Sequence, residues 1–406
     1  MEKNQDEPVS VLMVGIGGYG YYYVNVLLNE FPMGNVKING VVDPFARQSA
    51  CYPEITERNI SVFDTIEDFY NGGYTADLVV ISSPIHYHVP QSITALRHGS
   101  HVLCDKPIGA VIQDVDELIN VRDESGKWVM IGYQWSFSRT IQQLKSDILK
   151  GLFGAPKRLK TVCLWPRDDV YYHRNKWAGR IKDEQGLWIL DSPVNNAMAH
   201  FLHHLFYVLG DTIPTSASPQ EVTAELYRAN PIENYDTAAC RIFTHKGTEL
   251  LFYGSHVTVT EKGPMFHFEF EDAMISYGES SKEFVAVDKK GNLKNYGSPD
   301  VEHQFLKLFE AVETVRNPKP IICGPEAARS QILCMNGIQE SAPGILTFLK
   351  SMIERNESER RWCVTGLDDA LISCYRKAIL PSEAKYGWAS KGKTIDLTKY
   401  ACYPRE

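Results

Sequence analysis

The chain has 406 residues, of which 44% are hydrophobic and 23% are charged, and its formal net charge at pH 7 is −8. This length exceeds what one ordinary core supports, so we expect two domains. The acidic balance excludes a basic surface for nucleic acid or anionic membranes, and no apolar run is long enough to span a bilayer. The nine cysteines form no Cys-x-x-Cys pair. Together with a polar N-terminus that lacks a signal peptide, they indicate a reduced, cytoplasmic protein.

A short apolar strand followed by a glycine-rich turn lies near the start. Residues 11–14 (VLMV) suit one buried parallel strand, and the next six fit G-x-G-x-x-G: Gly15, Ile16, Gly17, Gly18, Tyr19 and Gly20. Gly15 would allow a tight turn, and Gly17 would let a pyrophosphate approach the backbone. Gly20 would let the next helix, expected at 21–30, pack on the strand with its N-terminal N–H groups toward the phosphates. The alternative is a strand-to-helix turn that binds no ligand.

The second strand, expected over residues 36–42, ends at Asp43. A carboxylate at this place in a dinucleotide-binding unit binds the ribose and repels the extra phosphate of NADP. We therefore predict that the cofactor is NAD and that NAD binds more tightly than NADP.

Four further apolar runs follow, mostly separated by helical patterns. The strands are expected at 61–63, 77–81, 101–104 and 128–133, with helices at 90–96 and 115–122. Alternating strands and helices indicate a parallel sheet covered on both faces, which binds ligands at the carboxyl ends of its strands. Gly15, Asp43, Pro84 and Lys106 fall at these ends. We assign residues 1–135 to this domain.

The pattern changes after about residue 138. A helix is expected at 140–150, a strand at 159–165 and a His-rich helix at 195–209, and strand-like runs follow at 238–244, 249–258 and 266–270. Consecutive strands imply a mostly antiparallel sheet with one open face, and its exposed apolar surface favours a homodimer or homotetramer. Helices are expected again at 302–315, 326–340 and 345–353. We assign 136–345 to a substrate-binding and oligomerisation domain and 346–406 to a C-terminal helical extension.

Three motifs resemble those of the glucose–fructose oxidoreductase / inositol dehydrogenase / rhizopine catabolism protein superfamily, over residues 9–342. The glycine turn is similar to the family's cofactor loop. Residues 83–88 (SPIHYH) resemble its T-P-N-x-x-H turn under the nicotinamide, with Ile85 in place of Asn. Residues 101–107 (HVLCDKP) resemble its H-V-x-x-E-K-P signature, with Asp105 in place of Glu. The resemblance implies an α/β chain: an N-terminal Rossmann domain, with a doubly wound parallel sheet, and a C-terminal α+β domain with a large, mostly antiparallel, open-faced sheet.

The resemblance also implies which residues contact the cofactor and the reacting hydroxyl. Beyond the glycine turn and Asp43, the expected cofactor contacts are Ser83, Pro84, His86, His88, Asp105 and Lys106. The family's signature lysine contacts the reacting hydroxyl, so Lys106 is a catalytic candidate. A desolvated ammonium beside a positive nicotinamide would have a lowered pKa and could stabilise a developing alkoxide. The alternative is a solvated surface lysine.

The family's other catalytic helix carries D-x-G-x-H-x-x-D before a Leu-Gly end. Counting back from Gly210 places its His at His200 and its first Asp at Asn196, so a family carboxylate is missing, and whether Asp191 compensates stays open. His200 is the candidate general base, since an intrinsic pKa of about 6.5 suits proton transfer at neutral pH. Asn196, predicted one helical turn earlier on the same face, would orient the substrate or one His tautomer. The alternative for His200 is a packed helix histidine.

Residues 165–180 mix aromatic rings with charged groups, as a carbohydrate site requires, although a surface loop anchored by its rings has the same composition. His200 and His204 have the spacing of a metal pair, but no third ligand is evident, so we expect no metal. His203 and His204 are interpreted as ordinary helix residues. The candidates for substrate binding are Lys106, Tyr133, Trp165, Arg167, Tyr172, Arg174, Trp177, Asn196 and His200.

These observations predict an NAD-dependent oxidoreductase acting on a ring hydroxyl or ketone of a sugar, sugar derivative or cyclitol. Lys106 and His200 come from different predicted domains and would meet at the nicotinamide. One alternative is a glycosidase that uses bound NAD redox-neutrally, by oxidation, elimination, hydration and reduction. Another is a non-catalytic NAD-binding regulator.

Overall fold

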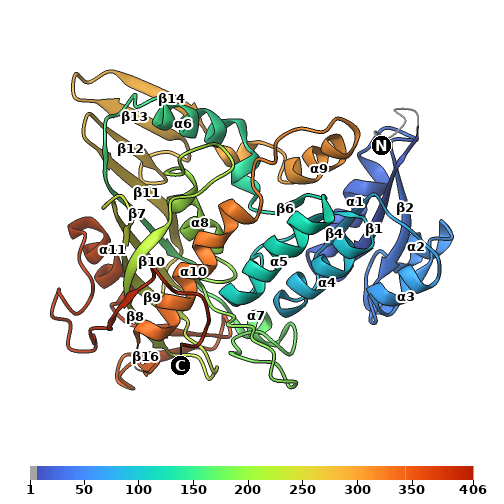
Figure 1. Cartoon of the computed structure of the whole chain (residues 1–406). Coiled ribbons are helices and arrows are strands. Elements are labelled where there is room, and N and C mark those ends of the chain that lie inside the picture. The colour runs from blue at the N-terminus through green and yellow to red at the C-terminus, as the bar shows by residue number, and fades with distance from the viewer. Residues whose placement is uncertain (1–6, 343, 406) are drawn as a thin grey trace. The chain divides into compact units, whose positions relative to one another are not determined.

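The structure is a computed structural model that describes residues 7–342 and 344–405, and it divides into two compact units (Figure 1). The first unit contains the chain up to Gly109, Gln113–Phe137 and Glu302–Ala328. The second contains Ala110–Ile112, Ser138–Val301 and the chain from Arg329 on. The division therefore differs from the predicted one in three places: residues 110–112 belong to the second unit, residues 302–328 return to the first, and the segment from residue 346 on is part of the second.

A parallel sheet of six strands forms the first unit, in the order β3-β2-β1-β4-β5-β6. This is the strand order of a Rossmann fold, so the predicted architecture is confirmed. The strands follow the apolar runs of the sequence because both faces of the sheet are covered. Their bounds are β1 (Val9–Val14), β2 (Val36–Val42), β3 (Val62–Phe63), β4 (Leu78–Ile81), β5 (His101–Cys104) and β6 (Val129–Ile131).

Helices connect these strands. They are α1 (Gly20–Asn29), α2 (Tyr52–Glu57), α3 (Ile66–Asn71), α4 (Ile85–Arg97) and α5 (Ile112–Ser125), joined by α9 (Leu306–Arg316) from the returning segment. The strand order changes direction at β1, so the carboxyl ends of β1 and β4 mark the place where a sheet of this kind binds its ligand.

A ten-stranded sheet, mostly antiparallel, forms the second unit in the order β14-β13-β12-β11-β7-β10-β9-β8-β15, with β18 also paired to β8. The pairs β7–β10 and β8–β15 are parallel. The strands are β7 (Pro156–Leu164), β8 (Pro219–Arg228), β9 (Thr237–Thr244), β10 (Glu249–Ser255), β11 (Lys262–Phe270), β12 (Ala273–Tyr277), β13 (Phe284–Asp288), β14 (Leu293–Gly297), β15 (Leu346–Thr347) and β18 (Thr394–Asp396). A separate hairpin joins β16 (Ile353–Asn356) and β17 (Arg361–Val364). The helices of the second unit are α6 (Arg139–Leu149), α7 (Asp169–His173), α8 (Ala199–Tyr207), α10 (Pro325–Ser341) and α11 (Leu367–Lys377).

The two faces of this sheet are covered by different parts of the chain. On one face the ring of His204 in α8 contacts Phe266 and Phe268 of β11. On the other, α11 packs against strands β7–β10 in one apolar cluster (Figure 1). The face that we expected to be open is therefore covered in part by the chain's own C-terminal segment. The cluster includes Val162, Leu164, Leu251, Tyr253, Leu367, Leu371 and Tyr375.

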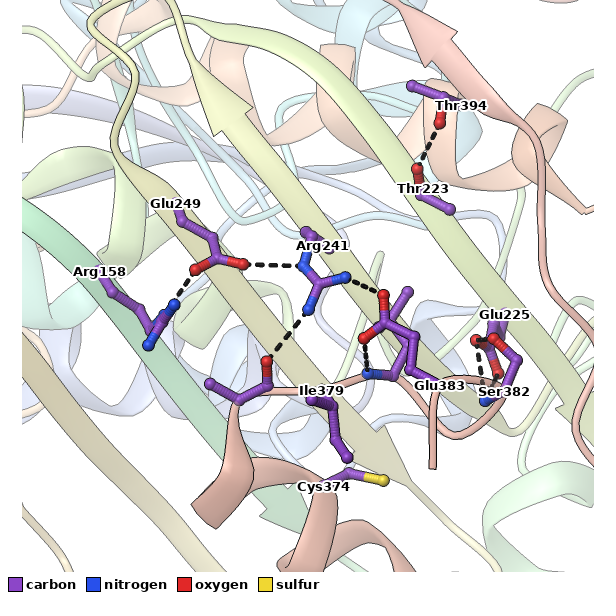
Figure 2. Close-up of polar contacts among 12 residues, drawn as sticks. Arg158, Thr223, Glu225, Arg241, Glu249, Cys374, Ile379, Ser382, Glu383 and Thr394 are labelled. Carbon is purple, nitrogen blue, oxygen red and sulfur yellow. Dashed lines mark hydrogen bonds and ion pairs between the residues drawn. The ribbon is translucent and has the colours of Figure 1, made fainter. Parts of the chain in front are cut away.

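Polar contacts reinforce this cover (Figure 2). Glu249 lies between two arginines, 2.5 Å from Arg158 and 2.8 Å from Arg241. Arg241 also pairs with Glu383 and donates to the carbonyl of Ala378 at 3.0 Å, both in the C-terminal segment. These contacts tie the loop after α11 to the sheet, so residues 346–406 are an integral part of the second unit.

Two sequence expectations for this unit are wrong. Residues 345–353 were expected to be helical, but they contain β15, which pairs with the edge strand β8, and they lead into β16. The described part of the predicted helical extension 346–406, residues 346–405, contains one helix, α11, and four short strands. Pairing with an available strand edge has overridden the local helical pattern. No helix in the part of the chain that the structure describes is both long and apolar enough to cross a membrane.

Candidate functional site

The three glycines of the turn after β1 have different structural roles. Gly15 has φ +79°, and a Cβ there would lie 2.8 Å from the backbone of Ser82 and Ser83. A Cβ on Gly20 would lie 2.0 Å from the carbonyl oxygen of Gly15. By contrast, Gly17 is exposed, and a Cβ on it would meet no described heavy atom within 4 Å. The fold itself therefore requires glycine at 15 and 20, whereas the open space at Gly17 fits a ligand that approaches the backbone, as a pyrophosphate would.

Asp43 lies beside this turn at the end of β2. Its Oδ2 accepts a hydrogen bond from the Ile16 N–H at 2.9 Å, and its Oδ1 accepts one from the Phe45 N–H at 2.8 Å. Ser49 donates to the carbonyl of Ile16 at 2.6 Å. The predicted ribose-binding carboxylate is thus held against the glycine turn. Ser49 was not among the predicted site residues because it belongs to no recognisable motif.

His88 connects the two turns that follow β4 and β5. Its ring nitrogens lie 2.7 Å from the carbonyl oxygen of Pro107 and 2.8 Å from that of Ser83. Burial lowers the pKa of His88. Ser83 also donates through its hydroxyl to Gln91 at 2.6 Å, and Pro84 and His86 lie at the start of α4. The S-P-I-H-Y-H and D-K-P motifs are therefore joined at one edge of the sheet.

A buried ion pair lies at the D-K-P turn. Lys307 of α9 approaches Asp105 to 3.1 Å and donates to the carbonyl of Gly132 at 3.2 Å. Sequence reasoning missed Lys307, although a single cation in the apolar run 305–309 (FLKLF) was a usable signal. Lys106, the next residue after Asp105, is half-buried, and Tyr133, a substrate candidate, is buried.

In the second unit, a carboxylate lies next to Asn196. The Asn196 amide donates to Asp191 Oδ1 at 2.7 Å, while Asp191 Oδ2 accepts from the Gly179 N–H at 2.6 Å. His200 is the second residue of α8, whereas Asn196 lies in the turn before that helix. The prediction that the two share a helix face is therefore wrong, because the helix starts four residues later than the expected 195. Asp191 supplies a carboxylate beside the position where the family motif has its own.

His203 and His204 are buried on α8 and contact core rings, those of Tyr207 and Phe266 respectively. Burial lowers the pKa of both, that of His204 to about 3. These are the properties of core histidines. Within residues 7–342 and 344–405, no group of three or more His, Cys, Asp or Glu side chains is arranged to hold a metal.

The polar, aromatic segment that includes α7 forms an alternating stack of rings and guanidinium groups. Arg167 lies 5.5 Å from the Trp165 ring and 4.9 Å from the Tyr171 ring. Arg174 lies 3.7 Å from the Tyr171 ring and 5.3 Å from the Trp177 ring. Such cation–π contacts make the segment rigid and occupy ring faces that sugars could otherwise use.

Tyr172 lies beside this stack. Its hydroxyl is buried, without a hydrogen-bond partner among the described residues, and burial raises its pKa. A ligand hydroxyl or carboxylate would satisfy this group, which supports keeping Tyr172 among the substrate candidates.

Comparison with known proteins finds a family model that matches the N-terminal part of the chain. Residues 9–133 match GFO_IDH_MocA, described as an oxidoreductase family with an NAD-binding Rossmann fold. The N-terminal part of the chain therefore matches the NAD-binding domain of this family. The matched region contains the glycine turn, Asp43 and the D-K-P turn, so the resemblance and the predicted NAD cofactor are confirmed at the level of the family.

Individual relatives are distant. A D-xylose 1-dehydrogenase [NADP(+)] of Haloarcula marismortui is 26% identical over 153 residues, 37% of this chain and 42% of the relative. A 2,7-anhydro-N-acetylneuraminate hydratase of Mediterraneibacter gnavus is 23% identical over 301 residues, 73% of this chain and 72% of the relative. The WlbA dehydrogenase of Bordetella pertussis, solved with NADH and UDP-GlcNAcA, aligns with TM-score 0.67 and 18% identity over 82% of this chain and 96% of that one. This last likeness shows the fold.

Proposed function

We propose that the chain is an NAD-dependent oxidoreductase that oxidises a ring hydroxyl, or reduces the corresponding ketone, of a sugar, sugar derivative or cyclitol. The observation that carries this proposal is the open backbone at Gly17 beside Asp43, on the sheet that also holds the D-K-P turn. Relatives named as a D-xylose 1-dehydrogenase and a D-glucoside 3-dehydrogenase support the substrate class. The cofactor would be held by the glycine turn, Asp43 and the turn at residues 83–88.

Proton handling falls to the protein, since NAD supplies only hydride transfer at its nicotinamide. Lys106 would donate a hydrogen bond to the reacting oxygen and stabilise negative charge that develops there. His200 would take the hydroxyl proton as general base. Asn196, fixed by Asp191, would orient the substrate through the rest of its hydrogen-bonding capacity.

The test is incubation with NAD and a panel of sugars, glycosides and inositols, following NADH absorbance and analysing products by mass spectrometry. Lys106→Ala should lower turnover about 10²- to 10⁴-fold without loss of NAD binding, because the glycine turn is untouched. His200→Ala should show a similar loss and an altered pH profile below about pH 7. Full turnover in both variants would overturn this site and favour a non-catalytic regulator.

Asn196→Asp separates two roles for this residue. If a carboxylate is tolerated there, activity stays or its pH optimum shifts. If Asn196 donates to the substrate, the change removes donors and places a second carboxylate beside Asp191, so KM should rise.

A redox-neutral glycosidase or hydratase is the second candidate. It is favoured by the 2,7-anhydro-N-acetylneuraminate hydratase, whose match extends over 73% of this chain. Such an enzyme would convert its substrate with catalytic NAD and no net NADH. Mass spectrometry of the products at constant absorbance distinguishes it from a dehydrogenase.

The predicted homodimer or homotetramer stays a proposal. It was predicted because one face of the sheet was expected to be open, and part of that face is covered by the chain itself. Any pairing through the sheet would therefore use strands β11–β14. Light scattering at micromolar concentration tests the proposal, and a monomer would contradict it. We also propose a cytoplasmic location, supported by nine free thiols.

A further inference from the structure

Lys307 is a buried cation in a largely apolar place. Its side chain is 1% exposed, and its ammonium lies 4.9 Å from the ring centre of Tyr19 and 5.0 Å from that of Tyr23. Burying an ammonium is costly unless a counter-charge compensates it, and Asp105 at 3.1 Å provides that charge. The pair is therefore a built feature and not an incidental surface contact.

The pair links two elements that we assign to the cofactor site. Tyr19 belongs to the glycine turn, and its ring stacks on Phe305, two residues before Lys307, at 5.5 Å. Asp105 follows the last residue of β5 and directly precedes Lys106. The side chain of Lys307 in the returning helix α9 thus contacts both the glycine turn and Asp105, the residue before the catalytic candidate Lys106.

The surroundings leave little room for another arrangement. A Cβ on Gly132 would stand 2.8 Å from Asp105 Oδ1 and 3.1 Å from Lys307 Nζ. The other titratable groups around the pair include Tyr19, Tyr23, Tyr133 and Cys104, whose pKa values burial raises, and His88, whose pKa burial lowers. All five are therefore neutral at pH 7. Burial lowers the pKa of Lys307, while Asp105 beside it acts in the opposite direction and favours the charged ammonium.

Removal of Lys307 would leave a buried carboxylate without this partner, one residue before Lys106. Asp105 and Lys106 are consecutive residues and both act electrostatically on the buried His88, so the carboxylate would favour the charged form of the Lys106 ammonium and raise its pKa. It would also compete with a substrate hydroxyl for the hydrogen bonds of that ammonium. We propose that Lys307 is a positioning residue that neutralises Asp105 and thereby keeps this carboxylate from drawing the Lys106 ammonium away from the substrate. The assignment of Lys106 to the substrate rests on the proposed function, whereas the effect of Lys307 on Lys106 does not.

The test measures Lys106 directly, without substrate or NAD. The full chain is reductively methylated with ¹³C-formaldehyde, and the Lys106 signal, assigned by its loss in Lys106→Arg, is titrated by NMR. In Lys307→Met the pKa of Lys106 should rise by about one unit. In the double variant Lys307→Met/Asp105→Asn it should return toward the original value, because the carboxylate is gone.

Lys319→Met is the matched control. Like Lys307→Met, it removes the lysine of an ion pair in the first unit. This pair joins Lys319 and Glu310 at 2.9 Å, but it lies at a partly exposed place. It should leave the Lys106 titration unchanged. A folded Lys307→Met protein, by circular dichroism, whose Lys106 titrates as in the wild type would overturn the inference.

Two further measurements keep the test decisive. If Lys307→Met does not fold, Gly132→Ala provides a milder change, since its methyl group pushes against both members of the pair, and the pKa of Lys106 should move in the same direction. Once a substrate is known, the alkaline limb of the kcat–pH profile should move upward in Lys307→Met and not in Lys319→Met, because Lys106 acts as the ammonium. A shifted Lys106 titration with no turnover on any substrate would instead refute the proposed function alone.

Discussion

The glycine turn offers a sharp test, because alanine substitutions at two of its glycines should impair different properties, stability in one case and ligand binding in the other. At Gly20 the new Cβ would lie 2.0 Å from the Gly15 carbonyl oxygen, so the backbone must move. At Gly17 the Cβ would meet no described heavy atom within 4 Å, and no positive φ strains the residue. Gly20→Ala should therefore damage the fold, and Gly17→Ala should damage only ligand binding.

The magnitudes follow from these contacts. Forcing a methyl group into the packed space at Gly20 should lower the free energy of unfolding by about 1–3 kcal/mol or more. Gly17→Ala should leave it unchanged or raise it by about 0.4–1 kcal/mol, because the unfolded chain loses freedom. If a pyrophosphate lies against Gly17, the methyl group overlaps it, and a similar cost of about 1–3 kcal/mol weakens NAD binding by a factor of about 5–150 in Kd.

Calorimetric titration with NAD and urea unfolding measure the two effects separately. Gly387→Ala is the control, since this glycine also has open space around it among the described residues and should leave both quantities nearly unchanged. Unaltered NAD affinity in Gly17→Ala would refute the assignment of the phosphate contact to this turn. A Gly20→Ala protein as stable as the wild type would refute the packing argument.

Three other predictions concern the cofactor, the C-terminal segment and acid stability. Asp43→Ala should narrow the difference between the affinities for NAD and NADP measured by calorimetry. Asp43→Asn keeps an acceptor for the Ile16 N–H and should disturb the glycine turn less than Asp43→Ala does. Equal affinities for NAD and NADP in the wild type would contradict the basis of this prediction. Leu371→Ala should lower the free energy of unfolding by about 2–5 kcal/mol, because this leucine is fully buried in the cluster that covers the sheet, and a change below 1 kcal/mol would mean that α11 packs loosely. Burial lowers the pKa of His204 and His256 to about 3 each, so between about pH 6.5 and 3 the unfolded state binds protons that the native state does not. Stability should therefore fall as the pH drops below about 6.5, by up to about 1.4 kcal/mol per histidine per pH unit in urea unfolding, and a flat profile from pH 6.5 to 5 would contradict it.

The sequence was most informative where one physical signal dominates. Strand β5 lies at the predicted residues 101–104 and β2 at 36–42, because both are apolar runs bounded by turn residues in a sheet covered on both faces. The second unit was harder to predict. Strands β8 and β12–β14 lack such runs, and β15 forms only because β8 presents an edge. The sequence around β15 does not indicate that such an edge is available for pairing.

The candidate site divides in the same way. Its turns are contiguous motifs and could be predicted, but Lys307 lies 202 positions from Asp105, and only the return of the chain to the first unit brings them together. The hydrogen bond between Asn196 and Asp191 spans five positions, yet it depends on a turn that was predicted as helix.

Two of the departures from the family motifs, at Asn196 and Asp105, are matched by a charged partner in the structure. Asn196 removes a carboxylate from the expected motif, but Asp191, buried and oriented by the Gly179 N–H, places one 2.7 Å from its amide. Asp105 is shorter than the family's glutamate, and Lys307 approaches it to 3.1 Å. Holding a buried carboxylate costs free energy unless hydrogen bonds or a counter-charge stabilise it, and here both are present. Such arrangements preserve control over proton position, which a binding-only protein does not need, and this favours the enzyme over the regulator.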